Sequence, residues 1–458
     1  MPGSPPGTPA GRPDRVARLV ERVRTPAKSI ERWYAAYGLL GAALGGLAPI
    51  LLPLDVSRRG GATEIGLVMA ALNLGGLTAP AWGALADRSR RYRTLLISGM
   101  ACNAVGLVGF ALVRTTGGWF ALALLQGAGG AAAATVANLF VVERHPRAEW
   151  DARIGWLQTF FGGGQVLGLA IAGAFGQALT RPGLAVAAAL AGVGALAGLL
   201  APSVGRAVGP AVRPALPRPP RRAEWPPASP QHHYHRLPLS ARGGWRELRG
   251  AIDARFGRFL LGWSLAYAGS AAVFAVYPVL MRQVYGVAPG LSSPAFALAA
   301  GLGLLLYSPA GAWSGRAGAS RVVKLGLAGR VLAFGAMYVL GFAAFGGRGW
   351  PAMAAFLVVV LCWSLISVGG TALTARLAPS GEGAGMGVFN ASTSLSGVLG
   401  AVLAGWAGGR FGYNTASAIA MAGVAAGLAV LLLERGERAR GGDAGSGRQS
   451  SSNEAIGG

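Results

Sequence analysis

The sequence predicts an all-α polytopic membrane protein with twelve transmembrane helices in two six-helix bundles, and three observations favour this fold class. Apolar stretches of about twenty residues recur along the 458-residue chain, and backbone groups in a bilayer are satisfied within helices. Charged residues make up only 13% of the chain, against roughly 25% in soluble domains. The 75 glycines suit close helix packing in lipid.

The apolar spans divide the chain into segments. Residues 1–32 form a polar N-terminal segment. Over 13–32, Val and Leu alternate with Arg and Glu, which predicts an amphipathic helix on the membrane surface. No cleavable signal peptide is recognisable, so the first span is expected to be an uncleaved anchor. The N-terminal bundle (33–201) has predicted spans at 33–55, 62–86, 93–113, 118–141, 153–179 and 183–201.

A central loop over 202–252, rich in Pro and Arg, separates the two predicted bundles and should be extended. At its end, apolar residues at helical spacing predict a short interfacial helix or an extension of the seventh span. The C-terminal bundle (253–433) has predicted spans at 254–281, 292–315, 321–346, 350–375, 384–409 and 412–433. The Gly/Ser-rich tail, 434–458, is expected to be disordered.

The distribution of basic residues predicts the orientation. With the N-terminus inside, 32 of the 41 Lys and Arg residues fall in inner segments and 7 in outer loops. Cytoplasmic loops of membrane proteins carry such an excess of positive charge, so both termini are expected in the cytoplasm. The expected location is the inner (plasma) membrane of the cell. The net charge of +24 therefore indicates topology, and nucleic acid is not an expected partner.

The two halves of the chain resemble each other. The segment from Gly155 to Gly173 matches the segment from Gly387 to Gly405 at an offset of 232, and Gln158 pairs with Asn390 in this register. A second match, at an offset of 228, relates 83–88 to 311–316. A parallel repeat of six spans is typical of transporters in which two bundles rock about a central site.

The loop after the second span carries the most specific motif. It reads Gly-Ala-Leu-Ala-Asp-Arg-Ser-Arg-Arg over 83–91 and resembles the signature loop of the major facilitator superfamily. The matching residues are Gly83, Leu85, Ala86, Asp87, Arg88 and Arg91. Arg90 stands where the family has a second glycine, which makes the turn less permissive. The resemblance, supported by the topology and the repeat, covers roughly residues 33–433.

The resemblance implies a gate at this loop. Asp87 is a carboxylate among arginines, and an anion is stabilised at a helix N-terminus. In the resembled family that helix is the eleventh span, which here begins near Gly383. The contact would bridge the halves on the inner side and favour the outward-open state. In the second copy of the motif Gly315 replaces the carboxylate, so the gate is expected to be asymmetric.

Two signals of drug exporters are incomplete. Exporters often carry an Arg separated by two residues from a Gln-Gly pair in the fourth span, and here Ala123 occupies that place before Gln126. A Gly-Pro pair is frequent in their fifth span, and here Gly164 is followed by Gln165. These departures weaken the case for drug–proton antiport.

Polar residues inside the spans are candidate substrate ligands because they are costly in lipid. In the resembled fold spans 1, 4, 7 and 10 line the cavity, which favours Tyr37, Gln126, Tyr267 and Trp363. The repeat-related pair Gln158 and Asn390 comes next. The other candidates are Asn73 and Gln165. For any one of them, a helix–helix hydrogen bond is as good an explanation.

The predicted function is secondary active or facilitative transport of a small organic solute by alternating access, with export favoured. Uptake of a sugar or related metabolite is the alternative, and a non-transporting sensor or assembly subunit is another. A cavity without Asp, Glu or Lys suggests an uncharged or amphipathic solute. Coupling to a proton or cation stays open. No catalytic residue, cofactor or metal is expected, since the His232, His233 and His235 cluster lies in a solvated loop, and the chain is expected to be a monomer.

Overall fold

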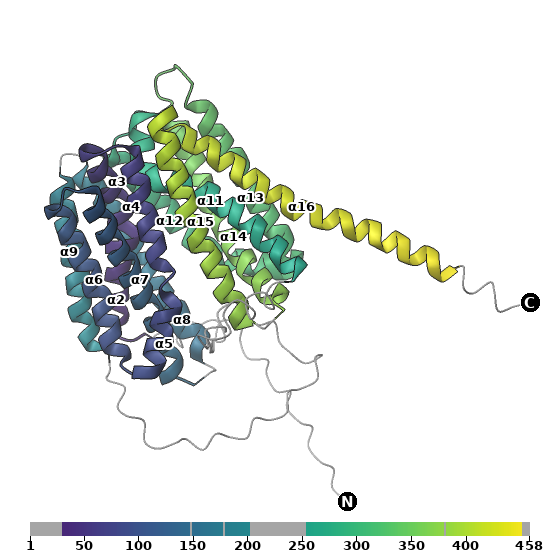
Figure 1. The fold of residues 1–458 in the computed structure, drawn as a ribbon, viewed down its shortest axis with the longest axis horizontal. Coiled ribbons are helices and arrows are strands. Elements are labelled where there is room, and N and C mark those ends of the chain that lie inside the picture. Colours follow the sequence, from purple (N-terminus) through teal and green to yellow (C-terminus); the bar gives the residue numbers. More distant parts are fainter. Residues whose placement is uncertain (1–29, 147–148, 177–178, 202–252, 380–381, 451–458) are drawn as a thin grey trace, which may run out of the picture.

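The computed structural model describes residues 30–146, 149–176, 179–201, 253–379 and 382–450, in which every regular element is a helix (Figure 1). The predicted amphipathic helix, the central loop with its histidine cluster and the predicted interfacial helix fall outside these residues, apart from the last residues of the N-terminal segment.

The N-terminal bundle comes first along the chain and forms one side of the molecule (Figure 1). Its first span consists of α2 (Tyr34–Leu40), the π-helical segment η2 (Gly41–Leu47) and α3 (Ala48–Arg59), and its second of α4 (Ala62–Gly76) and α5 (Ala79–Ser89). The others are α6 (Tyr92–Leu112), α7 (Thr116–Arg144), α8 (Trp150–Phe175) and α9 (Thr180–Ala197), which ends in the 3-10 turn η4 (Gly198–Leu200).

Prolines explain the two broken spans. Pro49 and Pro80 lack the N–H that would bond to the carbonyl four residues earlier, so the regular ladder is interrupted before each. The first interruption is taken up by η2 and the second by the break at Leu77 and Thr78 between α4 and α5.

The C-terminal bundle stands beside the first (Figure 1). Its helices are α11 (Ala254–Gln283), α12 (Pro289–Ala317), α13 (Ala319–Leu340), α14 (Gly349–Leu377), α15 (Glu382–Phe411) and α16 (Thr415–Ser450). The start of α11 is capped by Asp253, which accepts a hydrogen bond from the Phe256 N–H at 2.6 Å. Helix α16 continues to Ser450, through residues for which the sequence predicted a disordered tail, because extending a formed helix needs no new nucleation.

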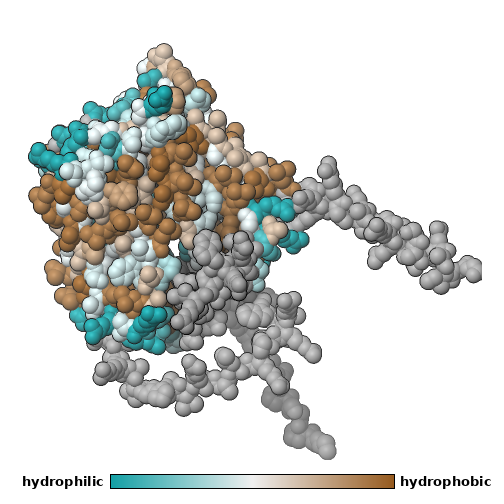
Figure 2. Space-filling model, in the orientation of Figure 1, coloured by the Kyte–Doolittle hydropathy of each residue, from teal (hydrophilic) through white to brown (hydrophobic). Residues whose placement is uncertain are grey.

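Eleven helices of the described chain are long and apolar enough to cross a membrane. The twelfth predicted span is α8, which has 26 residues and is made more polar by Gln158, Gln165 and the glycines between them. On the face shown in Figure 2, apolar side chains form a broad band across the helices, and polar side chains gather at both ends. The predicted all-α polytopic fold is therefore confirmed.

The sequence repeat corresponds to equivalent packing in the two bundles. Gly168 of α8 lies so close to the first span that a Cβ atom there would collide with the Ala42 carbonyl. Its repeat partner Gly400, in α15, lies equally close to the Ala268 carbonyl of α11. Both glycines allow a backbone-to-backbone approach that no other residue permits.

The turn between α5 and α6 shows why the family motif has a glycine there. Arg90 caps α5 in the left-handed region, at φ 53° and ψ 19°, where an L side chain costs roughly 1–2 kcal/mol. Among the residues that the structure describes, Arg90 is the one non-glycine residue with a positive φ. Its guanidinium pairs with Glu143 at 3.1 Å on the surface, which contributes little stability.

Candidate functional site

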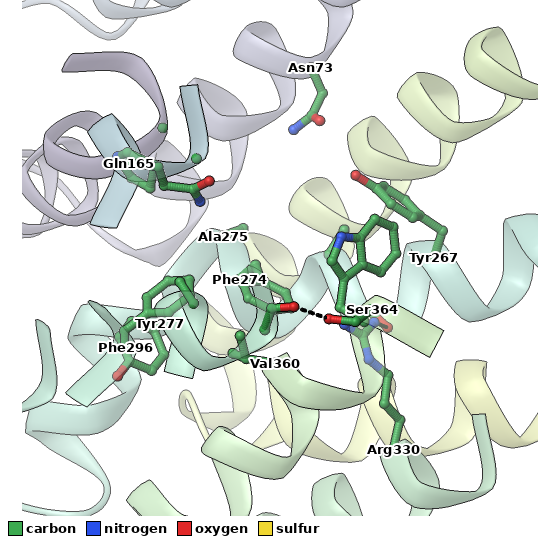
Figure 3. Close-up of a pocket in the computed structure, with 18 of the residues that line it drawn as sticks. Asn73, Gln165, Tyr267, Phe274, Ala275, Tyr277, Phe296, Arg330, Val360 and Ser364 are labelled. Atoms are coloured by element: carbon green, nitrogen blue, oxygen red, sulfur yellow. Dashed lines mark hydrogen bonds between the residues drawn. The ribbon is translucent and has the colours of Figure 1, made fainter. Parts of the chain in front are cut away.

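A cavity of about 400 Å³ lies between the two bundles (Figure 3). This volume is in the range that accommodates small organic ligands. The lining residues are Gly45, Pro49, Met69, Leu72, Asn73, Gly162 and Gln165 on the N-terminal side, and Tyr267, Ser270, Ala271, Phe274, Ala275, Tyr277, Phe296, Ala300, Gly303, Leu304, Tyr307, Arg330, Val360, Trp363 and Ser364 on the other.

The N-terminal bundle presents neutral amides and small residues to the cavity. Asn73 of α4 and Gln165 of α8 reach toward it from one side, facing the C-terminal bundle (Figure 3). The Asn73 Nδ2 donates to the Met69 carbonyl at 2.8 Å, and its Oδ1 lies against Gly397 of α15. Gln165 packs against Gly45 of η2. These amides can offer a solute neutral donors and acceptors.

The C-terminal bundle presents a buried arginine. Arg330 of α13 is only 3% exposed and borders the cavity. Its Nε donates to the Val359 carbonyl at 3.1 Å, and its Nη1 donates to the Ser270 Oγ at 2.8 Å. The guanidinium also lies 5.2 Å from the ring centre of Trp363 and 5.9 Å from that of Phe274. Each such cation–π contact stabilises the charge by about 0.5–2 kcal/mol.

None of the ion pairs in the described part of the chain includes Arg330. They link Asp55 with Arg59, Arg90 with Glu143, and Glu31 and Glu149 with Arg153 and His145. A buried guanidinium without a counter-ion costs several kcal/mol, which two hydrogen bonds and two aromatic rings offset only in part.

Aromatic residues form much of the remaining wall. Tyr267 and Trp363 meet edge to face at 5.9 Å between ring centres. Tyr277 stacks on Phe356 at 4.1 Å, and its hydroxyl donates to the Ser292 carbonyl at 2.8 Å, so this tyrosine fastens α11 to α12. The Ser364 hydroxyl is likewise committed to the Gly303 carbonyl at 2.8 Å (Figure 3).

The cavity includes Asn73, Gln165, Tyr267 and Trp363 from the predicted ligands. Tyr37 is buried instead against Phe161 of α8, at 5.1 Å between ring centres. Gln126 is fully buried in α7 with its side chain toward Gly106 of α6, and no residue of α7 lines the cavity. Both side chains face neighbouring helices of their own bundle.

Gln158 and Asn390 do not line the cavity, and both side chains are exposed. Gln158 is exposed on the face of α8 that carries Gly162 and Gln165, one and two turns further along. Asn390 is exposed on the face of α15 that meets α4 through Gly397. The repeat partners therefore occupy exposed positions on corresponding helices of the two bundles.

Sequence reasoning missed Arg330 as a site residue, although this arginine falls within the predicted ninth span, 321–346. An arginine within an apolar span is itself a functional signal. Its presence corrects the expectation of a neutral cavity, which was based on the absence of Asp, Glu and Lys alone. Ser270, which orients Arg330, carries no such signal because serines are common at helix contacts.

The bundles contact each other unevenly along the cavity axis. We call the end at which α5 meets α6 and α9 leads into the 202–252 segment the linker end. Toward the opposite end, α4 packs on α15 where Gly66 meets Gly405, and α8 packs on α12 where Gly173 meets Pro294. At the linker end, α5 packs on α7 and α6 of its own bundle. Among the described elements, these close contacts between the bundles therefore lie toward the end opposite the linker end.

The motif residues lie at the linker end. Asp87, Arg88 and Arg91 are exposed, Leu85 is 44% exposed, and Gly83 faces Thr135 of α7. Asp87 forms no ion pair with any residue that the structure describes.

A family model described as Major Facilitator Superfamily matches residues 33–384. The chain belongs to the Major Facilitator Superfamily. Solved structures with this fold include a point mutant of the nucleoside transporter NupG, with a TM-score of 0.68 and 14% identity over 88% of this chain and 98% of that chain. Unmutated NupG gives a TM-score of 0.66 at 12% identity, covering 88% and 97% of the two chains.

A further superfamily structure is a bacterial homologue of the lysosomal transporter Spinster in an inward-facing, unoccupied conformation. It gives a TM-score of 0.57 and 14% identity over 87% of this chain and 95% of that chain. A sequence search of curated proteins gives no significant match. The structural likenesses show the superfamily fold, and the family match establishes the membership.

Proposed function

We propose that this superfamily member is a secondary active or facilitative transporter that moves a small organic solute by alternating access. The observation that supports this proposal best is the central cavity, which residues of both bundles line, together with close contacts between the bundles toward the end opposite the linker end. Rocking the bundles about this cavity would close the linker end and open the other, as parallel-repeat transporters do.

The proposed orientation places the linker end in the cytoplasm of a cell with a plasma membrane. It follows from the 32-to-7 bias of Lys and Arg toward the segments at this end. The proposed net direction is export, the direction that the sequence analysis favoured.

Flux measurements test the function. Purified protein in proteoliposomes should move at least one member of a panel of small organic solutes, and an imposed pH gradient tests coupling to protons. Absence of flux for every solute, together with tight stoichiometric binding to another membrane protein, would favour the assembly-subunit alternative. Accumulation only in the cytoplasmic direction would instead favour uptake.

We also propose Asp87 as part of the gate at the linker end. The exposed carboxylate is free to reach the start of α15 when this end closes, and the helix dipole would stabilise it there. Asp87→Asn removes the charge and should shift the population several-fold toward the conformation that is open at the linker end.

Cysteine accessibility measures this shift. Gln158→Cys and Asn390→Cys, introduced separately where Cys102 and Cys362 are replaced by Ala, report on exposed positions of the two bundles. Both cysteines should react faster with a membrane-impermeant maleimide when Asp87 is changed to Asn. Arg316→Gln, an exposed change on the other bundle, is the control. Unchanged labelling rates would rule out the gate.

A further inference from the structure

We propose that the cavity selects a small organic anion, and that Arg330 binds its carboxylate or phosphate group directly. This inference deepens the proposed transport function, on which it rests for the role of the site. It starts from a buried positive charge at the cavity surface for which the described chain supplies no counter-ion.

The hydrogen bonds of Arg330 leave donors for a ligand. A guanidinium has five N–H donors, and the described partners are the Val359 carbonyl on Nε and the Ser270 hydroxyl on Nη1. These two bonds orient the group and attach α13 to α14 and α11. A purely structural role would be complete with them, whereas the remaining N–H groups suit the two oxygens of an oxyanion.

Trp363 and Phe274 restrict how a ligand can approach. Their rings lie near the guanidinium at 5.2 Å and 5.9 Å, so they occupy space around the group that a ligand cannot use. A carboxylate or phosphate that approaches in the guanidinium plane would keep these contacts and gain two charge-assisted hydrogen bonds. Because Arg330 is only 3% exposed, the charge pair would be stronger than on the surface.

The rest of the cavity indicates that the anion carries an apolar, preferably flat, body. Tyr267, Phe274, Phe296 and Trp363 line the C-terminal side, and aromatic walls favour stacking with a ring. Asn73 and Gln165 on the other side offer neutral polar contacts (Figure 3). The cavity volume of about 400 Å³ accommodates a substituted aromatic acid.

Matched acid and amide pairs test the charge requirement on the wild-type protein. Benzoate and naphthoate should bind the full chain in nanodiscs, measured by titration calorimetry, while benzamide and naphthamide, which have the same shape without the charge, should bind at least about tenfold more weakly. Equal affinity for acid and amide would overturn the proposal. Failure of every anion to bind at up to about 10 mM would also overturn it.

Phenyl phosphate distinguishes the two oxyanion chemistries. Tighter binding than benzoate assigns the site to phosphate esters, and weaker binding assigns it to carboxylates. Either result supports an anion site.

Variants of Arg330 test whether this residue supplies the positive charge that binds the anion. Arg330→Gln should weaken benzoate binding by about tenfold to a hundredfold and leave benzamide unchanged, and Arg330→Lys should recover part of the loss. Arg316→Gln, which removes an exposed arginine of the same bundle, should change neither. Benzoate binding that survives Arg330→Gln would overturn the assignment. If that variant does not fold, the wild-type acid and amide comparison still decides.

Flux separates this inference from the transport function. Anion binding without flux of any solute would retain the anion site and reject transport. Flux of neutral solutes without a preference for anions would retain transport and reject the anion site.

Discussion

The two bundles share a fold and a sequence repeat, but they treat buried charge differently. In the N-terminal bundle, Asp55 is 1% exposed and pairs with Arg59 at 2.5 Å. Thr180 of α9 donates to the same carboxylate at 3.1 Å, and Arg59 also donates to the Val113 carbonyl at 3.3 Å. In the C-terminal bundle, Arg330 borders the cavity, and no carboxylate among the residues that the structure describes forms an ion pair with it.

This difference separates structural charge from functional charge. The members of the Asp55–Arg59 pair neutralise each other and have hydrogen bonds within their own bundle, so they need no ligand. The bond from Thr180 to Asp55 holds α3 against α9. A buried cation that has unused hydrogen-bond donors at a cavity gains a counter-ion and acceptors only when a ligand binds. The N-terminal bundle would then supply the rigid wall and the C-terminal bundle the specificity.

The largest expected effect concerns the ion pair between Asp55 and Arg59. Asp55→Ala would leave the Arg59 guanidinium, whose side chain is only 15% exposed, without a carboxylate, so the free energy of unfolding should fall by about 3 kcal/mol. Thermal unfolding in detergent measures it. Glu143→Ala, which breaks the exposed pair with Arg90, is the matched control and should cost less than about 1 kcal/mol. A similar loss in both variants would contradict a structural role specific to the buried pair.

An intermediate effect tests the equivalence of the bundles. Gly168→Ala and Gly400→Ala each place a methyl group against the backbone of a neighbouring helix, so each should cost about 1–3 kcal/mol. Gly163→Ala is the control, because its Cβ would meet nothing within 4 Å. Loss of stability at only one of the two repeat positions would show that the bundles pack differently.

The smallest expected effect concerns Gln126, a predicted ligand that lies away from the cavity. Neither its Oε1 nor its Nε2 has a hydrogen-bond partner in the described chain. Gln126→Met keeps the volume and removes the buried polar group, so stability should be unchanged or rise by about 1 kcal/mol, with solute flux unaffected. Reduced flux at unchanged stability would instead restore Gln126 as a substrate ligand.

The fold was accessible from the sequence because a bilayer permits few solutions. Length, apolar composition and the distribution of basic residues predicted twelve spans, and the match around Gly168 and Gly400 predicted six plus six. The break at Pro80 could be expected from the missing N–H, whereas the π-helical turn at η2 depends on its fit against α8.

The candidate site was only partly accessible. Tyr267 and Trp363 were assigned by the rule that spans 7 and 10 line the cavity of the resembled fold, and both line the cavity here. Tyr37 and Gln126 were assigned by the same rule and point elsewhere. Helices that are apolar on every side have no polar stripe to show which face meets the cavity.

By itself, the sequence determined that the chain is a twelve-span membrane protein of the superfamily, because hydropathy and motif spacing are local properties. Only the tertiary structure decided which side chains share the cavity, because that depends on the rotation of each helix against its neighbours. It also decided that Arg330 meets Ser270, Phe274 and Trp363 but no described carboxylate. That arrangement turns an arginine in an apolar span into a proposed binding site.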